Sequence, residues 1–135
     1  MKPLKVLVLD DEPIVLRQLK KSLTRQGYIV EIFENPDQAV ARMKETRFDV
    51  VVSDIRMKEM NGLQVLEVVR SKWMRTKVII ITGYTSKEVE REALAKGAFD
   101  FITKPFKPRD LLLAINNAVQ ALGMVEADSA GEAEL

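Results

Sequence analysis

The chain has 135 residues, 47% of them hydrophobic, which is enough for one globular domain with a buried core and too little for two. It has no cysteine and no histidine, so disulfides, thiolate metal sites and catalysis by an imidazole are excluded. The formal net charge is +1 and the basic residues are scattered, so we expect no nucleic-acid binding. No apolar run is long enough for a membrane span or a signal peptide, so we expect a cytoplasmic protein that does not bind membranes.

Short β-branched runs alternate with longer amphipathic ones along the chain. The short runs predict five strands, at Lys5 to Asp10, Ile29 to Glu34, Asp49 to Asp54, Lys77 to Thr82 and Asp100 to Thr103. The amphipathic runs predict five helices, at Ile14 to Arg25, Pro36 to Thr46, Leu63 to Trp73, Ser86 to Lys96 and Pro108 to Leu122. This alternation predicts an α/β domain whose parallel sheet is covered by helices on both faces.

Local signals agree with these helix ends. Asn35 precedes a first-turn proline and Thr85 has a glutamate three residues later, so both are predicted helix caps. Gly27 and Gly97 follow the first and fourth predicted helices, where a left-handed residue commonly ends a helix. The predicted boundaries therefore rest on capping chemistry as well as on periodicity.

The segment from Gly123 to Leu135 differs in composition from the rest of the chain. It is rich in small residues and carries four acidic side chains and no basic one, namely Glu126, Asp128, Glu132 and Glu134. We predict a globular domain at residues 1–122, followed at 123–135 by an acidic flexible tail or the start of a linker.

Polar residues end four of the predicted strands: Asp10 and Asp11, Asp54, Thr82, and Lys104. In an open parallel sheet these ends meet at one crevice. Two carboxylates 4 Å apart repel by about 4 kcal/mol at an effective dielectric of 20, so the cluster requires a compensating cation. Oxygen ligands without nitrogen or sulfur favour Mg2+ shared with a phosphate, and one carboxylate is then available as a nucleophile.

Each of these residues also has an ordinary structural interpretation. The two adjacent acids, taken alone, are more often a solvated loop or a helix cap, and Asp54 is equally often a turn residue. Phe101 in "FDFITKP" is a typical core aromatic. The functional interpretation is favoured because four such features end four different strands of one sheet.

Four motifs in order, "LDDE", "VVSDIRM", "IITGY" and "GAFDFITKPF", make the sequence resemble a response-regulator receiver domain of two-component signalling. The resemblance covers about residues 4–122. It implies a flavodoxin-like fold with a five-stranded parallel sheet in the order 2-1-3-4-5.

The resemblance also implies a role for each matching acid. Asp10 and Asp11 would hold Mg2+, and Asp54 would be both a metal ligand and the phosphoacceptor. The backbone carbonyl of Arg56 would complete the protein's share of the metal shell. Arg56 and Tyr84 would influence the lifetime of the phosphoryl group.

Three further residues are assigned to the switch by the same resemblance. Thr82 would donate its hydroxyl to the acyl phosphate, and Lys104 would pair with a phosphoryl oxygen. Phe101 would be the aromatic whose rotamer follows Thr82. The peptide bond between Lys104 and Pro105 would be cis.

The implied function is a signalling domain and not an enzyme, although it would assist its own phosphorylation and dephosphorylation. It would receive a phosphoryl group from a sensor histidine kinase or a phosphotransfer protein. We expect phosphorylation to promote a homodimer through the fifth strand and the last helix. The last helix has a wide apolar stripe that serves either this partner face or the core: Leu111, Leu112, Ile115, Ala118, Val119 and Leu122.

Other classes fit the sequence less well. A phosphohydrolase with an aspartyl nucleophile needs an acid two residues after it, where this chain has Arg56. A nucleotide-binding module needs a glycine-rich loop after the first strand, and the first glycine is Gly27. The alternative that remains is a phosphate-independent, receiver-like interaction module. The sequence leaves open whether the chain is a free-standing receiver or the amino-terminal piece of a longer protein.

Overall fold

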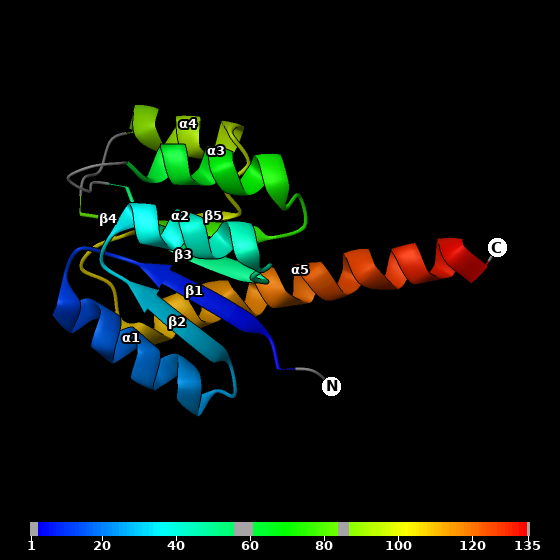
Figure 1. Cartoon of the computed structure of the whole chain (residues 1–135), viewed down its shortest axis with the longest axis horizontal. Helices are drawn as coiled ribbons and strands as arrows, with labels where there is room; N and C mark the ends of the chain where they lie inside the picture. The colour runs from blue at the N-terminus through cyan, green and yellow to red at the C-terminus, as the bar shows by residue number, and fades with distance from the viewer. Residues whose placement is uncertain (1–2, 56–60, 84–86, 135) are drawn as a thin grey trace.

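The computed structural model describes residues 3–55, 61–83 and 87–134, with side chains described as far as residue 123. In these residues five strands alternate with five helices (Figure 1). The strands are β1 (Lys5–Leu9), β2 (Ile29–Phe33), β3 (Val50–Asp54), β4 (Lys77–Thr82) and β5 (Asp100–Thr103). The helices are α1 (Pro13–Arg25), α2 (Pro36–Glu45), α3 (Gly62–Lys72), α4 (Lys87–Ala95) and α5 (Pro108–Glu134). Every predicted element is present, and all ends except that of α5 agree within one residue.

The five described strands form one parallel sheet in the order β2-β1-β3-β4-β5, which confirms the predicted flavodoxin-like topology. The central strands are in close register, since Val8 pairs with Val52 and Val52 pairs with Ile79. Their carboxyl ends therefore lie along one edge of the sheet. The residues that follow β1, β3, β4 and β5 are brought to that edge.

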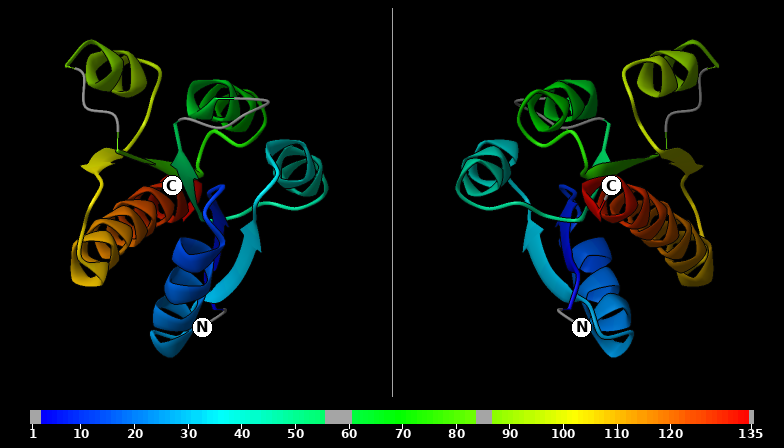
Figure 2. Two further views of the ribbon diagram at one scale, coloured as in Figure 1. Left: turned by 90° about the vertical axis from the view of Figure 1, so that its left-hand side faces the viewer. Right: turned by 90° about the vertical axis from the view of Figure 1, so that its right-hand side faces the viewer.

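Helices cover both faces of the sheet (Figure 2). An apolar layer lies between the helices and the sheet on each face. Helices α2, α3 and α4 pack on one face against alternate strand residues that include Leu7, Val51 and Ile80. Helices α1 and α5 pack on the other face, where the strands contribute residues such as Val8 and Ile79. The central strands are thus buried on both sides, as their continuous apolar runs predicted.

The local signals that the structure describes have the expected geometry. The Asn35 side chain caps α2 by accepting hydrogen bonds from two first-turn amides at 2.8 and 3.2 Å. Gly27 and Gly97 have positive φ angles of 92° and 103°, which glycine adopts without strain. The predicted cap at Thr85 lies outside the described residues.

Helix α5 is longer than predicted, because it continues from Leu122 to Glu134. Gly123 disfavours a helix by about 1 kcal/mol relative to alanine, but the alanine, methionine and glutamate residues after it are strong helix formers. The helix end projects past the sheet, away from the carboxyl ends of the strands (Figure 1). Neither α5 nor any other helix in the described part of the chain is apolar enough to cross a membrane.

The apolar stripe of α5 belongs mainly to the core, which is one of the two alternatives that the sequence left open. Leu111, Ile115, Ala118 and Leu122 are at most 4% exposed and pack against the sheet. Leu112 and Val119 are partly buried against the same layer. The stripe is wide because α5 crosses several strands of the sheet. Leu113, which was not predicted, is the large exposed apolar residue of the described part of α5, at 62%.

Candidate functional site

Four carboxylates meet at the carboxyl edge of the sheet. Asp10 follows β1, Asp54 ends β3, and Asp11 and Glu12 lie in the turn before α1. One ligand oxygen from each lies within 4.8 Å of those of the others. Asp10 is fully buried and Asp54 is 5% exposed, whereas Asp11 and Glu12 are exposed. The predicted acids are therefore brought together, and Glu12 joins them although no role was predicted for it.

The backbone around Asp10 fixes this carboxylate in place. Its amide donates to the Phe33 carbonyl at 3.1 Å, which extends the pairing of β1 with β2 by one residue. Its Oδ1 accepts a hydrogen bond from the Glu12 amide at 2.9 Å, so the chain turns directly into α1 at Pro13. One carboxylate oxygen is thus used to shape the turn, and the other lies beside Lys104.

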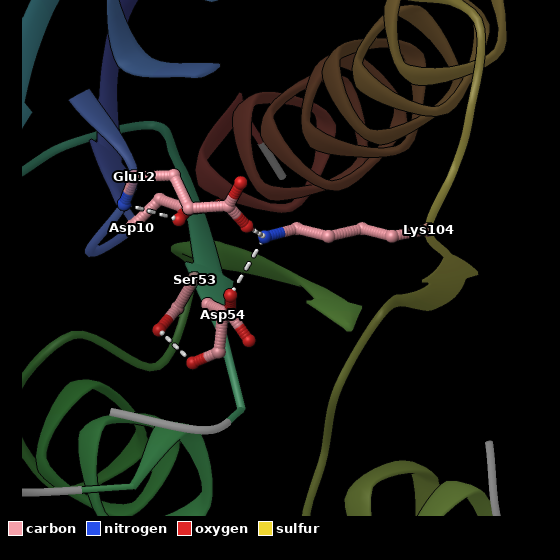
Figure 3. A network of polar contacts seen from close by, with 5 residues as sticks. All are labelled: Asp10, Glu12, Ser53, Asp54 and Lys104. Carbon is pink, nitrogen blue, oxygen red and sulfur yellow. Dashed lines mark hydrogen bonds and ion pairs between the residues drawn. The ribbon is translucent and has the colours of Figure 1, made fainter. Parts of the chain in front are cut away.

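Lys104 enters the cluster from the end of β5 (Figure 3). Its Nζ lies 2.7 Å from Asp10 Oδ2, 2.8 Å from Asp54 Oδ2 and 2.9 Å from Glu12 Oε1. Its amide donates to the Thr82 carbonyl at 2.6 Å, and its peptide bond to Pro105 is cis, as predicted. In this structure Lys104 is the cation that offsets the repulsion between the acids.

Burial and charge act against each other in this cluster. Burial raises the pKa of Asp10, and attraction by Lys104 together with the Glu12 amide lowers it only in part. Burial lowers the pKa of Lys104, but the contacts of its ammonium with Asp10, Asp54 and Glu12 outweigh this effect, so the net pKa is raised. Lys104 therefore stays protonated, and Asp10 is a carboxylate whose charge is costly to bury.

The donor set fits a hard divalent cation. Asp10 Oδ2 is fully buried, and the ammonium of Lys104 at 2.7 Å compensates its charge. Such an oxygen, beside three more carboxylates, is the environment that Mg2+ prefers. Asp10, Asp11 and Asp54 are the predicted ligands, and the structure adds Glu12 to the available oxygens.

Thr82 ends β4, and Phe101 lies on the neighbouring strand β5. Asp54 pairs with Ile81, so Thr82 is one residue further toward the edge, and it is 1% exposed. Phe101 is half-buried against the layer formed with α2, α3 and α4. The switch role of Thr82 and Phe101 stays a prediction. Arg56 and Tyr84 lie outside the described residues.

No role was predicted for Gly62, which controls how closely α3 approaches the site. A Cβ at this position would overlap the Asp54 carbonyl oxygen and lie 2.8 Å from the Ile55 Cα. The Gly62 amide donates to the Ile55 carbonyl at 2.9 Å, and a reciprocal capping box at Asn61 starts the helix directly before it. The signal in the sequence is a capping asparagine followed by glycine, which alone indicates a helix start and not a close contact.

Comparison with known proteins decides the family. The family model described as "Response regulator receiver domain" matches residues 6–116. The chain belongs to this family. Receiver domains are signalling domains that interact with histidine kinases and typically bind Mg2+ at an acidic cluster, which here corresponds to the carboxylates around Asp10 and Asp54.

Curated relatives of this receiver domain are longer transcriptional regulators. The Regulatory protein AtoC of Escherichia coli is 38% identical over 120 residues, which cover 89% of this chain and 26% of AtoC. The DNA-binding transcriptional regulator NtrC of Proteus hauseri is 32% identical over 114 residues, covering 84% of this chain and 24% of NtrC. The chain thus spans about a quarter of the length of these two relatives.

Solved structures of receiver domains have the same fold. A CheY-like receiver domain protein from Methanospirillum hungatei superposes with a TM-score of 0.88 and 31% identity, covering 91% of this chain and 98% of that one. The beryllofluoride-activated NtrC4 receiver domain dimer gives a TM-score of 0.83 and 31% identity, covering 87% and 98%. Both structures match this receiver domain over most of its length.

Proposed function

We propose that this receiver domain accepts a phosphoryl group on Asp54 from a histidine kinase or a phosphotransfer protein in a Mg2+-dependent reaction in the cytoplasm. The observation that carries the proposal is the position of Asp54. It lies at the carboxyl edge of the sheet, grouped with three other carboxylates within 4.8 Å and with Lys104 Nζ at 2.8 Å. A nucleophile, oxygen ligands for a metal and a cation for the phosphoryl oxygens thus lie within one small volume.

The chain's own residues divide the work of phosphoryl transfer. An Asp54 oxygen forms a bond to phosphorus while the bond from phosphorus to the donor breaks, and the donor retains that electron pair. Asp10, Asp11 and the Arg56 carbonyl help hold Mg2+, which when bound neutralises charge on the phosphoryl oxygens. Lys104 is then no longer needed to neutralise the acids, and it pairs with a phosphoryl oxygen instead.

Mg2+-dependent labelling by a small phosphodonor tests this assignment. Acetyl phosphate is expected to phosphorylate the protein with Mg2+ and not with EDTA, and Asp54→Asn is expected to abolish labelling. Asp49→Asn is the matched control, because Asp49 lies just before β3 at the opposite end and accepts a hydrogen bond from the Lys5 amide, which asparagine also accepts. Equal labelling of Asp54→Asn and the control would contradict the proposal.

Signal output is proposed to leave through β5 and α5. Phosphorylated Asp54 draws the Thr82 hydroxyl inward, Phe101 follows, and the surface at β5 changes. β5 is an edge strand, and a cavity of about 400 Å³ lies between it and α5 beside the exposed Leu113. The occupant that we propose is a second copy of the domain, which agrees with the dimer named for the NtrC4 receiver.

Sedimentation with and without beryllofluoride tests this switch. The phosphoryl mimic is expected to dimerise the wild type, and both Thr82→Ala and Leu113→Ser are expected to weaken the dimer. A wild type that binds the mimic but stays monomeric would overturn the proposed face. Arg56 and Tyr84 are proposed to restrict the water that attacks the aspartyl phosphate, so their alanine variants are expected to shorten its lifetime. Signalling that persists in Asp54→Asn would instead favour the phosphate-independent module.

A further inference from the structure

A cavity of about 450 Å³ opens between the start of α1 and the segment after β5. We call it the α1 cavity. Most of its wall is apolar, with Val15 and Leu19 from α1 opposite Pro105 and Phe106. Glu12, Gln18 and Lys104 are the polar side chains of the wall. Its volume lies in the range of pockets that bind small molecules, about 300–1,000 Å³.

The α1 cavity adjoins the acid cluster, because Glu12 and Lys104 line the cavity and also contact each other in the cluster. Lys104 Nζ lies 2.8 Å from Asp54 Oδ2 and 2.9 Å from Glu12 Oε1, while the Lys104 side chain also lines the cavity. A molecule in the cavity can therefore have one end beside Lys104, which contacts the proposed nucleophile. Its other end contacts Val15 and Phe106.

We propose that the α1 cavity receives the leaving group of small acyl phosphate donors, and that it favours donors with an extended apolar acyl chain over acetyl phosphate. This inference rests on the proposed function of Asp54. An Asp54 oxygen bonds to phosphorus, the bond between phosphorus and the acyl oxygen breaks, and the carboxylate leaves with that electron pair, so no proton or further reactant is needed.

Charge and polarity both fit such a leaving group. An in-line displacement moves the leaving carboxylate away from Asp54, and the Lys104 side chain lines the α1 cavity. Its ammonium has three N–H donors, so it can contact the leaving carboxylate as well as a phosphoryl oxygen. The acyl chain then contacts the apolar wall formed by Val15, Leu19 and Phe106. An acetyl group is too short to gain much from this wall, whereas a butyryl group adds two methylenes to the contact.

The test compares acetyl phosphate with butyryl phosphate as donors to Asp54 at saturating Mg2+. The parent acids are of nearly equal strength, and rates of the two donors with hydroxylamine in solution correct for remaining differences in reactivity. Complete burial of two methylenes corresponds to about 15-fold, and an open cavity gains part of that. The corrected kcat/KM for butyryl phosphate is expected to be about 3- to 10-fold higher, mainly through a lower KM.

Variants of the cavity wall locate the effect. Val15→Ser is expected to bring the butyryl-to-acetyl ratio close to one, and Gln18→Leu, which adds an apolar side chain to the same wall, is expected to raise it. Gln18 is exposed, so that variant remains informative if Val15→Ser is poorly folded. Met74→Ser is the matched control, because Met74 is an apolar residue that is 73% exposed and lies outside the cavity lining.

Three outcomes separate this inference from the proposed function. Equal corrected kcat/KM values for the two donors in the wild type would overturn the proposed role of the α1 cavity, while the proposal that Asp54 is phosphorylated would stand. A wild-type preference that Val15→Ser, correctly folded, and Gln18→Leu both leave unchanged would also overturn it. Failure of both donors to label Asp54 in Mg2+ would contradict the proposed function, and this inference with it.

Discussion

Replacing Lys104 by methionine removes the charge that neutralises the acid cluster and keeps most of the side chain's apolar length. Asp10 and Asp54 then face each other within 4.8 Å, a repulsion of about 3.5 kcal/mol at an effective dielectric of 20. Removing one partner of a buried ion pair costs about 3–5 kcal/mol. The Lys104 side chain is 15% exposed and solvent screens part of the interaction, so we expect a loss of about 2–3 kcal/mol in the free energy of unfolding without Mg2+.

Thermal unfolding in EDTA measures this loss. For a domain of this size 1 kcal/mol shifts the Tm by about 3–5 °C, so the Lys104→Met variant is expected to melt about 6–15 °C below the wild type. Mg2+ that binds only the folded state stabilises by mass action. The gain at a given Mg2+ concentration is expected to be larger for the variant, because no ammonium competes for the carboxylates.

Lys96→Met is the matched control. Lys96 also contacts two carboxylates, those of Glu67 and Glu92, but all three side chains are substantially exposed. Its Tm is expected to stay close to that of the wild type, with an unchanged response to Mg2+. The account of the cluster would be refuted if Lys104→Met melted with the wild type in EDTA, or if Mg2+ stabilised both proteins equally.

Substitutions at three further positions test other parts of the structure by urea unfolding. Because the pKa of Asp10 is raised in the folded state, its charge costs stability as the pH rises above 3.8 and through that pKa. Without Mg2+, Asp10→Asn is therefore expected to be more stable than the wild type at neutral pH, to lose this advantage below pH 3.8, and to respond less to Mg2+. Lower stability of the variant at neutral pH would contradict this. Gly62→Ala is expected to cost about 1–3 kcal/mol because its methyl group overlaps the backbone at Asp54, and an unchanged midpoint would argue against that close contact. Asn35→Ala is expected to cost about 1 kcal/mol through the lost cap of α2, whereas Asn35→Ser, which can still cap, is expected to retain most of the stability.

The order of strands and helices was predictable because burial on both faces gives the central strands continuous apolar runs, while the helices keep a 3.6-residue period. The meeting of Asp10, Asp54, Thr82 and Lys104 at one edge follows from the parallel sheet, since each residue ends a strand or follows one directly. The strand order itself came from the resemblance to receiver domains and not from periodicity, which carries no information about which strands are neighbours.

Other features depend on three-dimensional contacts that a linear pattern does not contain. Glu12 joins the acid cluster because the Asp10 side chain accepts a hydrogen bond from the Glu12 amide and so forms a turn. Position 62 requires glycine because the backbone carbonyl of the residue eight positions earlier lies against it. The role of the wide apolar stripe of α5 stayed open in the sequence, because only the contacts show that a helix crossing several strands buries residues such as Leu112 and Val119 at the margins of its main stripe. The end of α5 was missed because a glycine followed by small and acidic residues is typical of a helix end, whereas this helix continues to Glu134.

The most direct test of the central claim is to locate the phosphoryl group by mass spectrometry. The protein is incubated with Mg2+ and acetyl phosphate, the acyl phosphate is trapped by borohydride reduction, and its peptides are mapped. The account predicts one phosphoryl group per chain before trapping, with the reduced residue at position 54, and neither in EDTA. A modification at Asp10, Asp11 or any other residue, or one that forms equally without Mg2+, would contradict the account.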